Sequence, residues 1–359
     1  MPKVSRIALF LLTLLCFLPL STLKFPKKEK DLSVFKNIGS SSIVIEKETG
    51  RVLSESNATE RKEMASTTKI ATTYCALLKG NLQQEVVISP EMCNIEGSSI
   101  YLKAGEIWTL EQLLYGTMLR SGNDAATAVA IAVCGNISAF VNELNKISQN
   151  LGLLDTNYEN PHGLHGENHY TTALDLAKLP KAALNHPVFA KIAATKRISF
   201  IRPDGQRVTF INKNKFLSQY NGACGVKTGF TTQSGRCFVS AATKNDMTLI
   251  GVVLNDYNMW ESSQRQFDEV FQNYQMCDVF GPTRKFKPDE SSYLSAVANS
   301  CNYPLTEKEY NDLRYEITWR NLTKKPIKIG QYIGEIHVYL QNRLLFSEKL
   351  YTILDENTI

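Results

Sequence analysis

The chain has 359 residues, of which 43% are hydrophobic and 21% charged, a composition typical of an ordinary globular protein. This length suits one large domain and one small one. The formal charge of +5 falls to about +3 if Lys3 and Arg6 leave with an N-terminal segment, and no arginine-rich run occurs. Nucleic acid is therefore largely excluded as a partner.

Residues 1–23 have the layout of a signal peptide. Basic residues precede an apolar run over residues 7–20, which is shorter than the roughly 18 residues that a membrane span needs. We expect cleavage near residues 21–23, a linker over 24–40, and export to the periplasm or cell envelope. An uncleaved segment attached to the inner membrane stays open, because no small-x-small site is present and lysines follow at once.

The apolar spacing predicts the elements of a first domain over residues 41–283. Two strands are expected around the turn at Gly50, and a helix is expected over residues 66–78. Further helices are predicted over 110–119, 125–134, 171–184 and 260–274. Three strands over 223–228, 237–243 and 247–254 predict an antiparallel meander.

Residues 284–359 change in character. Apolar and polar residues alternate around residues 315–319, 327–329 and 336–340, which predicts a small all-β C-terminal domain. The sequence after Leu350 shows no amphipathic helix that could lie on a membrane.

Seven cysteines remain after residue 23, an odd number with no C-x-x-C pair, and most lie in apolar stretches that favour buried thiols. Cys224 and Cys237 flank a predicted hairpin and are best placed for a disulfide, a question the sequence leaves open. No metal or other cofactor is expected. The histidines at 162, 165 and 169 are interrupted by glycines and lack a zinc-binding pattern.

Three short patterns carry the chemistry, Ser66-Thr-Thr-Lys69, Ser121-Gly-Asn123 and Lys227-Thr-Gly229. The first two recur elsewhere in the chain, so each is weak alone. Their context strengthens them, because the first opens a predicted helix, the second lies between two helices, and the third ends a strand.

Each placement has a chemical reason. A serine at a helix start and a lysine three residues on share one face, so the Lys69 amine can reach the Ser66 hydroxyl. Burial and a second cation, Lys227, would lower the pKa of Lys69 towards that of a working base. The backbone N–H groups of Ser66 and Phe230 would form an oxyanion hole, and Gly229 would let a substrate backbone approach.

With these motifs the chain resembles the penicillin-binding proteins of low molecular mass, the serine D-alanyl-D-alanine carboxypeptidases of bacterial cell-wall metabolism. The resemblance runs from about residue 41 through the C-terminal domain. Beyond the three motifs it rests on three further segments, namely Ile45 to Leu53, Asn160-Pro-His-Gly-Leu164 and Pro326-Ile-Lys-Ile-Gly-Gln331. It implies a three-layer αβα penicillin-binding and serine β-lactamase-like domain, with a central antiparallel sheet and a helical subdomain, followed by a β-rich domain.

The resemblance also implies a role for each motif residue. Ser66 would be the acylated nucleophile, Lys69 its general base, and Ser121 a proton relay to the leaving D-alanine. Asn123 would hold the peptide, and Lys227 with Thr228 would face its terminal carboxylate. The substrate would be the peptidoglycan stem pentapeptide, and β-lactams would be covalent inhibitors.

Two departures and two rival functions remain. The family often carries an arginine at the start of the last helix of the catalytic domain, where this chain has Trp260, with Arg265 unassigned about a turn later; the family's C-terminal membrane anchor is also missing. A serine β-lactamase would need a carboxylate to hold the water that hydrolyses its acyl-enzyme. The nearest acidic residue, Glu159, is not part of the Glu-x-x-Leu-Asn pattern that such enzymes show. A non-catalytic envelope scaffold would have no use for an intact Ser–Lys pair. The sequence does not separate carboxypeptidase from endopeptidase or transpeptidase activity.

Overall fold

The computed structural model describes residues 40–280, 285–287, 295–320 and 328–353, so the predicted signal peptide and all but the last residue of the predicted linker lie outside it. The chain divides into two compact units, one ending at Gln272 and the other beginning at Asn273. The sequence placed this boundary at residues 283 and 284. It falls earlier because β10 (Gln275–Asp278) pairs with β12 (Asn302–Leu305) of the second unit.

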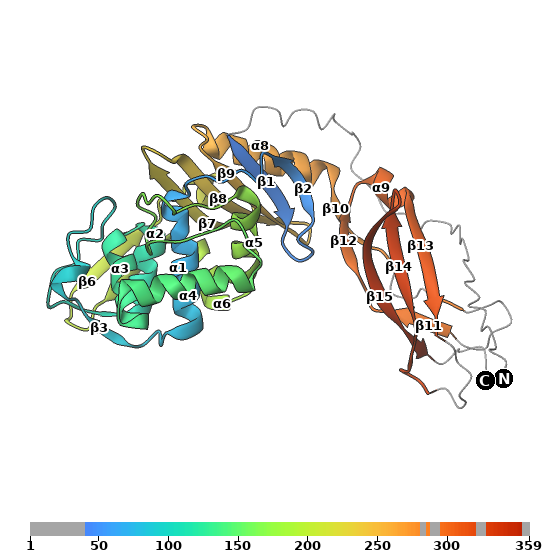
Figure 1. Ribbon diagram of the computed structural model, residues 1–359, viewed down its shortest axis with the longest axis horizontal. Helices are drawn as coiled ribbons and strands as arrows, with labels where there is room; N and C mark the ends of the chain where they lie inside the picture. The colour runs from blue at the N-terminus through green and yellow to red at the C-terminus, as the bar shows by residue number, and fades with distance from the viewer. Residues whose placement is uncertain (1–39, 281–284, 288–294, 321–327, 354–359) are drawn as a thin grey trace, which may run out of the picture. The chain divides into compact units, whose positions relative to one another are not determined.

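The first unit is built on a five-stranded antiparallel sheet in the order β2-β1-β9-β8-β7 (Figure 1). The predicted hairpin and meander are present as β1 (Ser41–Glu46) with β2 (Val52–Ser56), and as β7 (Ala223–Thr231), β8 (Gly235–Lys244) and β9 (Met247–Leu254). β1 pairs with β9 and joins the two groups. β7 is left as an edge strand of the sheet, and η2 (Ala65–Thr68) and α6 (Pro187–Ala194) lie against it.

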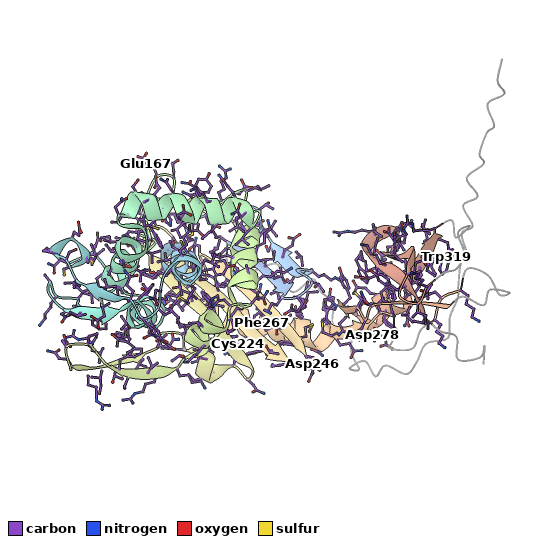
Figure 2. All side chains as sticks on the ribbon, turned by 90° about the horizontal axis from the view of Figure 1, so that it is seen from below. Glu167, Cys224, Asp246, Phe267, Asp278 and Trp319 are labelled. Atoms are coloured by element: carbon purple, nitrogen blue, oxygen red, sulfur yellow. The ribbon has the colours of Figure 1, made fainter. Side chains whose placement is uncertain are left out.

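Helices cover both faces of this sheet, which confirms the predicted three-layer architecture (Figure 1). On one face α5 (Ala173–Ala183) packs against β1 and β9. On the other lies α8 (Met259–Asn273), which carries Phe267 (Figure 2). A Cβ added at Gly251 of β9 would come 2.7 Å from the Phe267 ring, so the helix packs closely on the strand. Phe216 of α7 (Phe216–Gln219) packs edge-on against both Phe238 and Phe267.

A helical subdomain stands beside the edge strand. It contains the short 3-10 turn η2 (Ala65–Thr68), α1 (Lys69–Lys79), α2 (Leu110–Leu119), α3 (Asn123–Cys134), α4 (Ile137–Asn150) and α6 (Pro187–Ala194). The helix predicted from Ser66 therefore starts as a 3-10 turn. α3 begins two residues earlier than predicted, because Asn123 and Asp124 occupy its first turn. Among the described residues no single helix is long and apolar enough to cross a membrane; α3 and α4, bent by 87° where they meet, reach that length and composition only as a pair.

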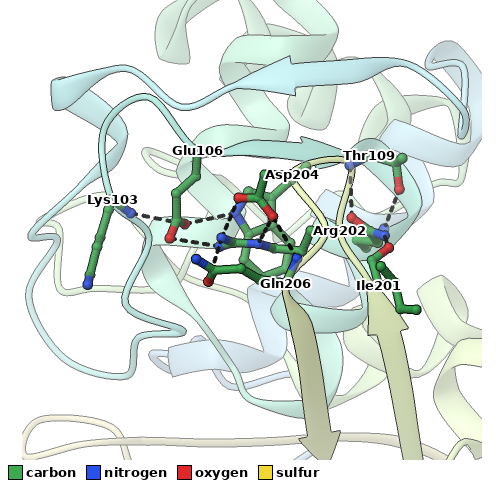
Figure 3. A network of polar contacts seen from close by, with 9 residues as sticks. Lys103, Glu106, Thr109, Ile201, Arg202, Asp204 and Gln206 are labelled. Atoms are coloured by element: carbon green, nitrogen blue, oxygen red, sulfur yellow. Dashed lines mark hydrogen bonds and ion pairs between the residues drawn. The ribbon is translucent and has the colours of Figure 1, made fainter.

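Two small antiparallel ribbons are tied together by the buried Arg202 (Figure 3). One ribbon is β3 (Glu85–Val87) with β4 (Ile107–Thr109), and the other is β5 (Arg197–Ile201) with β6 (Arg207–Ile211). The guanidinium pairs with Glu106 at 2.7 Å and with Asp204, and it lies 5.0 Å from the Trp108 ring. The ribbon β5–β6 leads directly into residues 212–214 beside the site described below.

The described part of the second unit is all-β apart from the short α9 (Glu307–Asn311). Its four-stranded sheet has the order β11 (Ser295–Ala298), β15 (Arg343–Ile353), β14 (Tyr332–Leu340) and β13 (Leu313–Trp319), as the alternating pattern predicts. Ile329 lies in an exposed turn instead of a strand, and Ile327 falls outside the described residues.

The seven cysteines after residue 23 are all free thiols. The bridge considered for Cys224 and Cys237 is therefore not formed. Cys237 is buried opposite Gly229 in the β7–β8 ladder, and burial raises the pKa of its thiol to about 11.

We predict that Arg202→Met lowers the free energy of unfolding by about 2–4 kcal/mol, because it leaves Glu106 partly buried without its cation. Arg207→Met, at an exposed position of the same ribbon, is the matched control and should change stability by no more than about 0.5 kcal/mol. Urea unfolding of both variants measures the difference. Equal stabilities would show that the ion pair does not hold the ribbons together.

Candidate active site

Ser66 lies in η2, in a backbone turn that is fixed from two sides. The preceding Ala65 is buried and has a φ of 46°, a left-handed conformation that is costly for an alanine. Its carbonyl accepts a hydrogen bond from the Thr68 hydroxyl at 2.8 Å. On the other side lies Gly163, where an added Cβ would come 1.8 Å from the Ala65 carbonyl oxygen. The turn thus presents Ser66 at one defined position.

Lys69 is the first residue of α1, and its side chain is completely buried. Its Nζ lies 2.9 Å from Ser66 Oγ, 2.6 Å from Asn123 Oδ1 and 2.6 Å from the His162 carbonyl oxygen. No described carboxylate forms an ion pair with it. Two of the three partners can only accept hydrogen bonds, whereas the serine hydroxyl can also donate one.

This difference decides which partner the Lys69 lone pair faces when the amine has lost a proton. A neutral amine keeps two N–H donors, which satisfy the oxygens of Asn123 and His162, and its lone pair then points at the Ser66 hydroxyl. The Ser66 O–H can donate into that lone pair. The geometry therefore suits Lys69 as a base for Ser66.

The electrostatics favour the same neutral state. Burial, and secondly the charges of Lys227 and Lys213, hold the pKa of Lys69 well below its ordinary value. Burial also lowers the pKa of Lys227 to about 7, with Lys213 adding to the effect. Burial and the nearby Arg120 lower the pKa of Lys213 itself. The second cation predicted from the sequence is thus present, together with a third.

Ser121 and Lys227 form a second pair. Ser121 lies between α2 and α3 with a φ of 61°, and its hydroxyl accepts a hydrogen bond from Lys227 Nζ at 3.1 Å. Lys227 also donates to the Thr228 carbonyl oxygen at 2.7 Å. Both side chains are buried, so the interhelical loop is tied to the edge strand at this point.

Asn123 and Asp124 organise the loop in front of the site. Asn123 donates through Nδ2 to the Glu96 carbonyl at 2.5 Å, while its Oδ1 accepts from Lys69. The buried Asp124 carboxylate accepts from the backbone N–H groups of Ile100 at 3.1 Å and Leu102 at 3.0 Å. Loop 96–102 is therefore held against the start of α3.

Gly229 brings the edge strand close to the nucleophile. An added Cβ there would lie 3.0 Å from the Ser66 backbone nitrogen and 3.1 Å from Ala65 Cβ. Phe230 follows at once, with its ring largely exposed. The structure thus brings together Ser66, Lys69 and Asn123 as one bonded group, and Ser121 with Lys227 as another, with Gly229 beside Ser66.

The three clustered histidines turn to different partners. Nδ1 of the buried His169 accepts from the Glu159 backbone N–H at 3.1 Å, so Nε2 carries the proton and donates to the Thr68 hydroxyl at 2.8 Å. Burial lowers the pKa of His169 to about 4 and that of His162 to about 3. His165 pairs with Glu63 at 2.7 Å. Within the described ranges no three His, Cys, Asp or Glu residues gather as metal ligands.

Sequence reasoning missed three contributors to the site. The His162 backbone carbonyl has no signal in the side-chain sequence. Lys213 follows the ribbon β5–β6, lies outside the three motifs, and donates to the Ser98 hydroxyl at 2.9 Å. Asp124 could have been found, since an acid directly after Asn123 falls in the first turn of the helix.

A serine hydroxyl beside a buried, unpaired lysine, on an αβα scaffold with an edge strand next to the serine, defines a serine hydrolase that uses lysine in place of histidine. The family described as D-alanyl-D-alanine carboxypeptidase matches residues 29–258, and the penicillin-binding protein 5 C-terminal domain matches residues 271–357. The chain belongs to this carboxypeptidase family, and it is a serine D-alanyl-D-alanine carboxypeptidase.

Individual relatives agree over most of the chain. The carboxypeptidase DacF of Bacillus subtilis is 30% identical over 94% of this chain and 90% of its own length. DacC of Escherichia coli is 30% identical over 84% of this chain and 80% of its own. Penicillin-binding protein 5 of Haemophilus influenzae superposes with a TM-score of 0.74 at 25% identity, covering 89% of this chain and 98% of that one.

The cation cluster predicts a specific pH dependence. Lys213→Gln removes a charge that lowers the pKa of both Lys69 and Lys227, so the pKa of Lys69 rises and the acidic limb of acylation moves to higher pH. Acylation rate constants with labelled penicillin across the pH range measure the limb. Lys215→Gln, an exposed neighbour of equal charge, should leave the limb in place. A limb that stays put or moves to lower pH in Lys213→Gln would contradict the electrostatic argument.

Proposed function

We propose that this carboxypeptidase works through an acyl-enzyme on Ser66 and removes the terminal D-alanine of peptidoglycan stem pentapeptides. The proposal is carried by the three contacts of the Lys69 amine. The Asn123 and His162 oxygens can only accept hydrogen bonds, so the Ser66 hydroxyl is the partner that can donate to the neutral amine. Serine activation then needs no histidine.

The steps follow from these contacts. Ser66 Oγ attacks the carbonyl carbon of the penultimate D-alanine while its proton passes to Lys69 Nζ. Ser121 then gives its hydroxyl proton to the leaving amine as the peptide bond breaks and D-alanine departs, and the proton held by Lys69 replaces it. Water attacks the resulting ester and gives one proton to Lys69, which passes it to Ser66 Oγ as the ester bond breaks and the free serine is restored. Every proton taken up in one step is returned in the next.

The charge that develops on the carbonyl oxygen needs donors. The backbone N–H groups of Ser66 and Phe230 would supply them. The position of Gly229, next to Phe230, supports this assignment, because a Cβ added there would lie 3.0 Å from the Ser66 backbone nitrogen. Asn123 would hold the peptide, and Lys227 with Thr228 would bind its terminal carboxylate. β-lactams, which also offer a carbonyl beside a carboxylate, would acylate the same serine.

Export supports access to this substrate. The predicted signal segment over residues 1–23 would carry the protein to the periplasm or cell envelope, where peptidoglycan is found, and an uncleaved segment would attach it to the inner membrane. The β-lactamase alternative has less support. The Glu159 carboxylate accepts from the Asn168 backbone N–H at 3.1 Å and makes no described contact with Ser66 or Lys69.

Ser66 is tested directly by acylation and turnover. Labelled penicillin should attach to the wild-type protein and leave slowly, and a peptide ending in D-alanyl-D-alanine should release D-alanine whether or not a chelator is present. Ser66→Ala should lose the label and lower release by about 10³-fold or more. Ser218→Ala, at an exposed serine, is the control. Labelling of Ser66→Ala would refute the assignment, and rapid loss of the label would favour a β-lactamase.

Lys69 is tested by removing its ability to accept a proton. Lys69→Arg should nearly abolish acylation, because a guanidinium stays protonated. The larger head group at a fully buried position should also lower the free energy of unfolding by about 1–3 kcal/mol. Lys69→Met, of similar length but without the bulky head group, therefore serves as a second variant that cannot accept the proton. Lys79→Arg at the exposed end of α1 controls for the helix. Acylation near the wild-type rate in a folded Lys69 variant would show that another group is the base.

A further inference from the structure

One exposed cation beside the edge strand has no role in the chemistry described so far. Arg236 is the second residue of β8 and pairs in register with Phe230 of β7. Its guanidinium carbon lies 5.8 Å from the Phe230 ring centre and 5.4 Å from that of Tyr257, which follows β9. Both rings are largely exposed, at 64% and 83%. Two solvent-facing aromatic side chains thus flank one guanidinium.

Arg236 has no anion of its own among the residues that the structure describes. None of the ion pairs there includes it. Asp256 is close in the fold, since its backbone N–H donates to the Arg236 carbonyl at 2.9 Å, but its carboxylate is buried and accepts from the Asn258 backbone N–H. The rings restrict the guanidinium without neutralising it, and its N–H groups remain available for a planar anion.

The ladder register places Arg236 on a definite side of the sheet. Because side chains alternate, Thr228 and Phe230 of β7 share one face with Phe238 and Arg236 of β8. This is the face covered by α8, since Phe238 packs edge-on against Trp260 at 4.7 Å. Thr228 lies diagonally across from Arg236, a separation that a long side chain can span.

We infer that Arg236, held between Phe230 and Tyr257, binds the terminal carboxylate of the substrate together with Thr228. The inference rests on the proposed function, in which that carboxylate lies beside Lys227 and Thr228. A guanidinium offers two parallel N–H donors that match both carboxylate oxygens, which the single ammonium of Lys227 cannot do. α8 begins with Met259 and Trp260, so its first turn offers no cation that could serve instead.

This position of Arg236 also predicts which substrates the enzyme should distinguish. A peptide ending in a free D-alanine carboxylate would use Arg236, whereas the same peptide ending in a carboxamide has no anion to bind. Arg236 is then a specificity residue for free carboxyl ends, and it takes no part in proton transfer.

The test compares diacetyl-L-lysyl-D-alanyl-D-alanine with its C-terminal amide, following release of D-alanine or D-alaninamide. Arg236→Gln should lower kcat/KM for the acid by about 10- to 100-fold and for the amide by less than about 2-fold. Arg236→Lys should recover only part of the loss, because it restores charge without the fork. Arg265→Gln removes an exposed cation from α8 and should change neither substrate.

The possible results separate the two proposals. Equal losses for acid and amide in Arg236→Gln would indicate a structural role, and no loss for either would show that the carboxylate is bound elsewhere; each overturns the inference while wild-type turnover stands. Failure of the wild-type protein to label at Ser66 or to release D-alanine would instead count against the proposed function. Equal midpoints of thermal denaturation for the variants and the wild type would establish that all of them are folded.

Discussion

The burial of the Lys69 amine is the constraint around which the first unit is arranged. Removing an ammonium from water without a carboxylate partner costs several kcal/mol, unless the group loses its proton or finds other oxygens. Both happen here. The oxygens come from three separate segments, the η2 turn, the start of α3 and the loop at residues 160–164, so these segments must be assembled together before the amine is satisfied.

The same constraint explains why the neighbouring cations remain close together. Three lysines in one region repel each other, and part of that repulsion disappears because burial lowers the pKa of Lys227 to about 7, leaving it only partly charged near neutral pH. An anion that binds beside Lys227 favours its protonated form. The binding site can therefore gain positive charge when a carboxylate arrives and carry less of it when empty.

The sequence was informative where the signal is local. Apolar periodicity over short windows was enough to predict the hairpin around Gly50, the helix α2 and the three-stranded meander. The three motifs identify residues that the fold brings into contact. α4 also has a helical apolar pattern behind the Asn136 cap, which the sequence reading passed over. Long-range contributions were not accessible. The His162 carbonyl acts through the backbone, and Lys213 reaches the site because its backbone N–H donates to the Leu119 carbonyl at 3.0 Å and its amine to the Ser98 hydroxyl at 2.9 Å.

The Asp124 carboxylate gives loop 96–102 an unusual kind of cooperativity. One buried side chain accepts from the backbone at Ile100 and Leu102 and from the Ser99 hydroxyl, in a stretch without regular secondary structure. Helices and sheets distribute such bonds over many residues and fray gradually from their ends. Here the bonds share one acceptor, so loss of the Asp124 contacts would release them together, and loop 96–102 is expected to open as a small folding unit of its own.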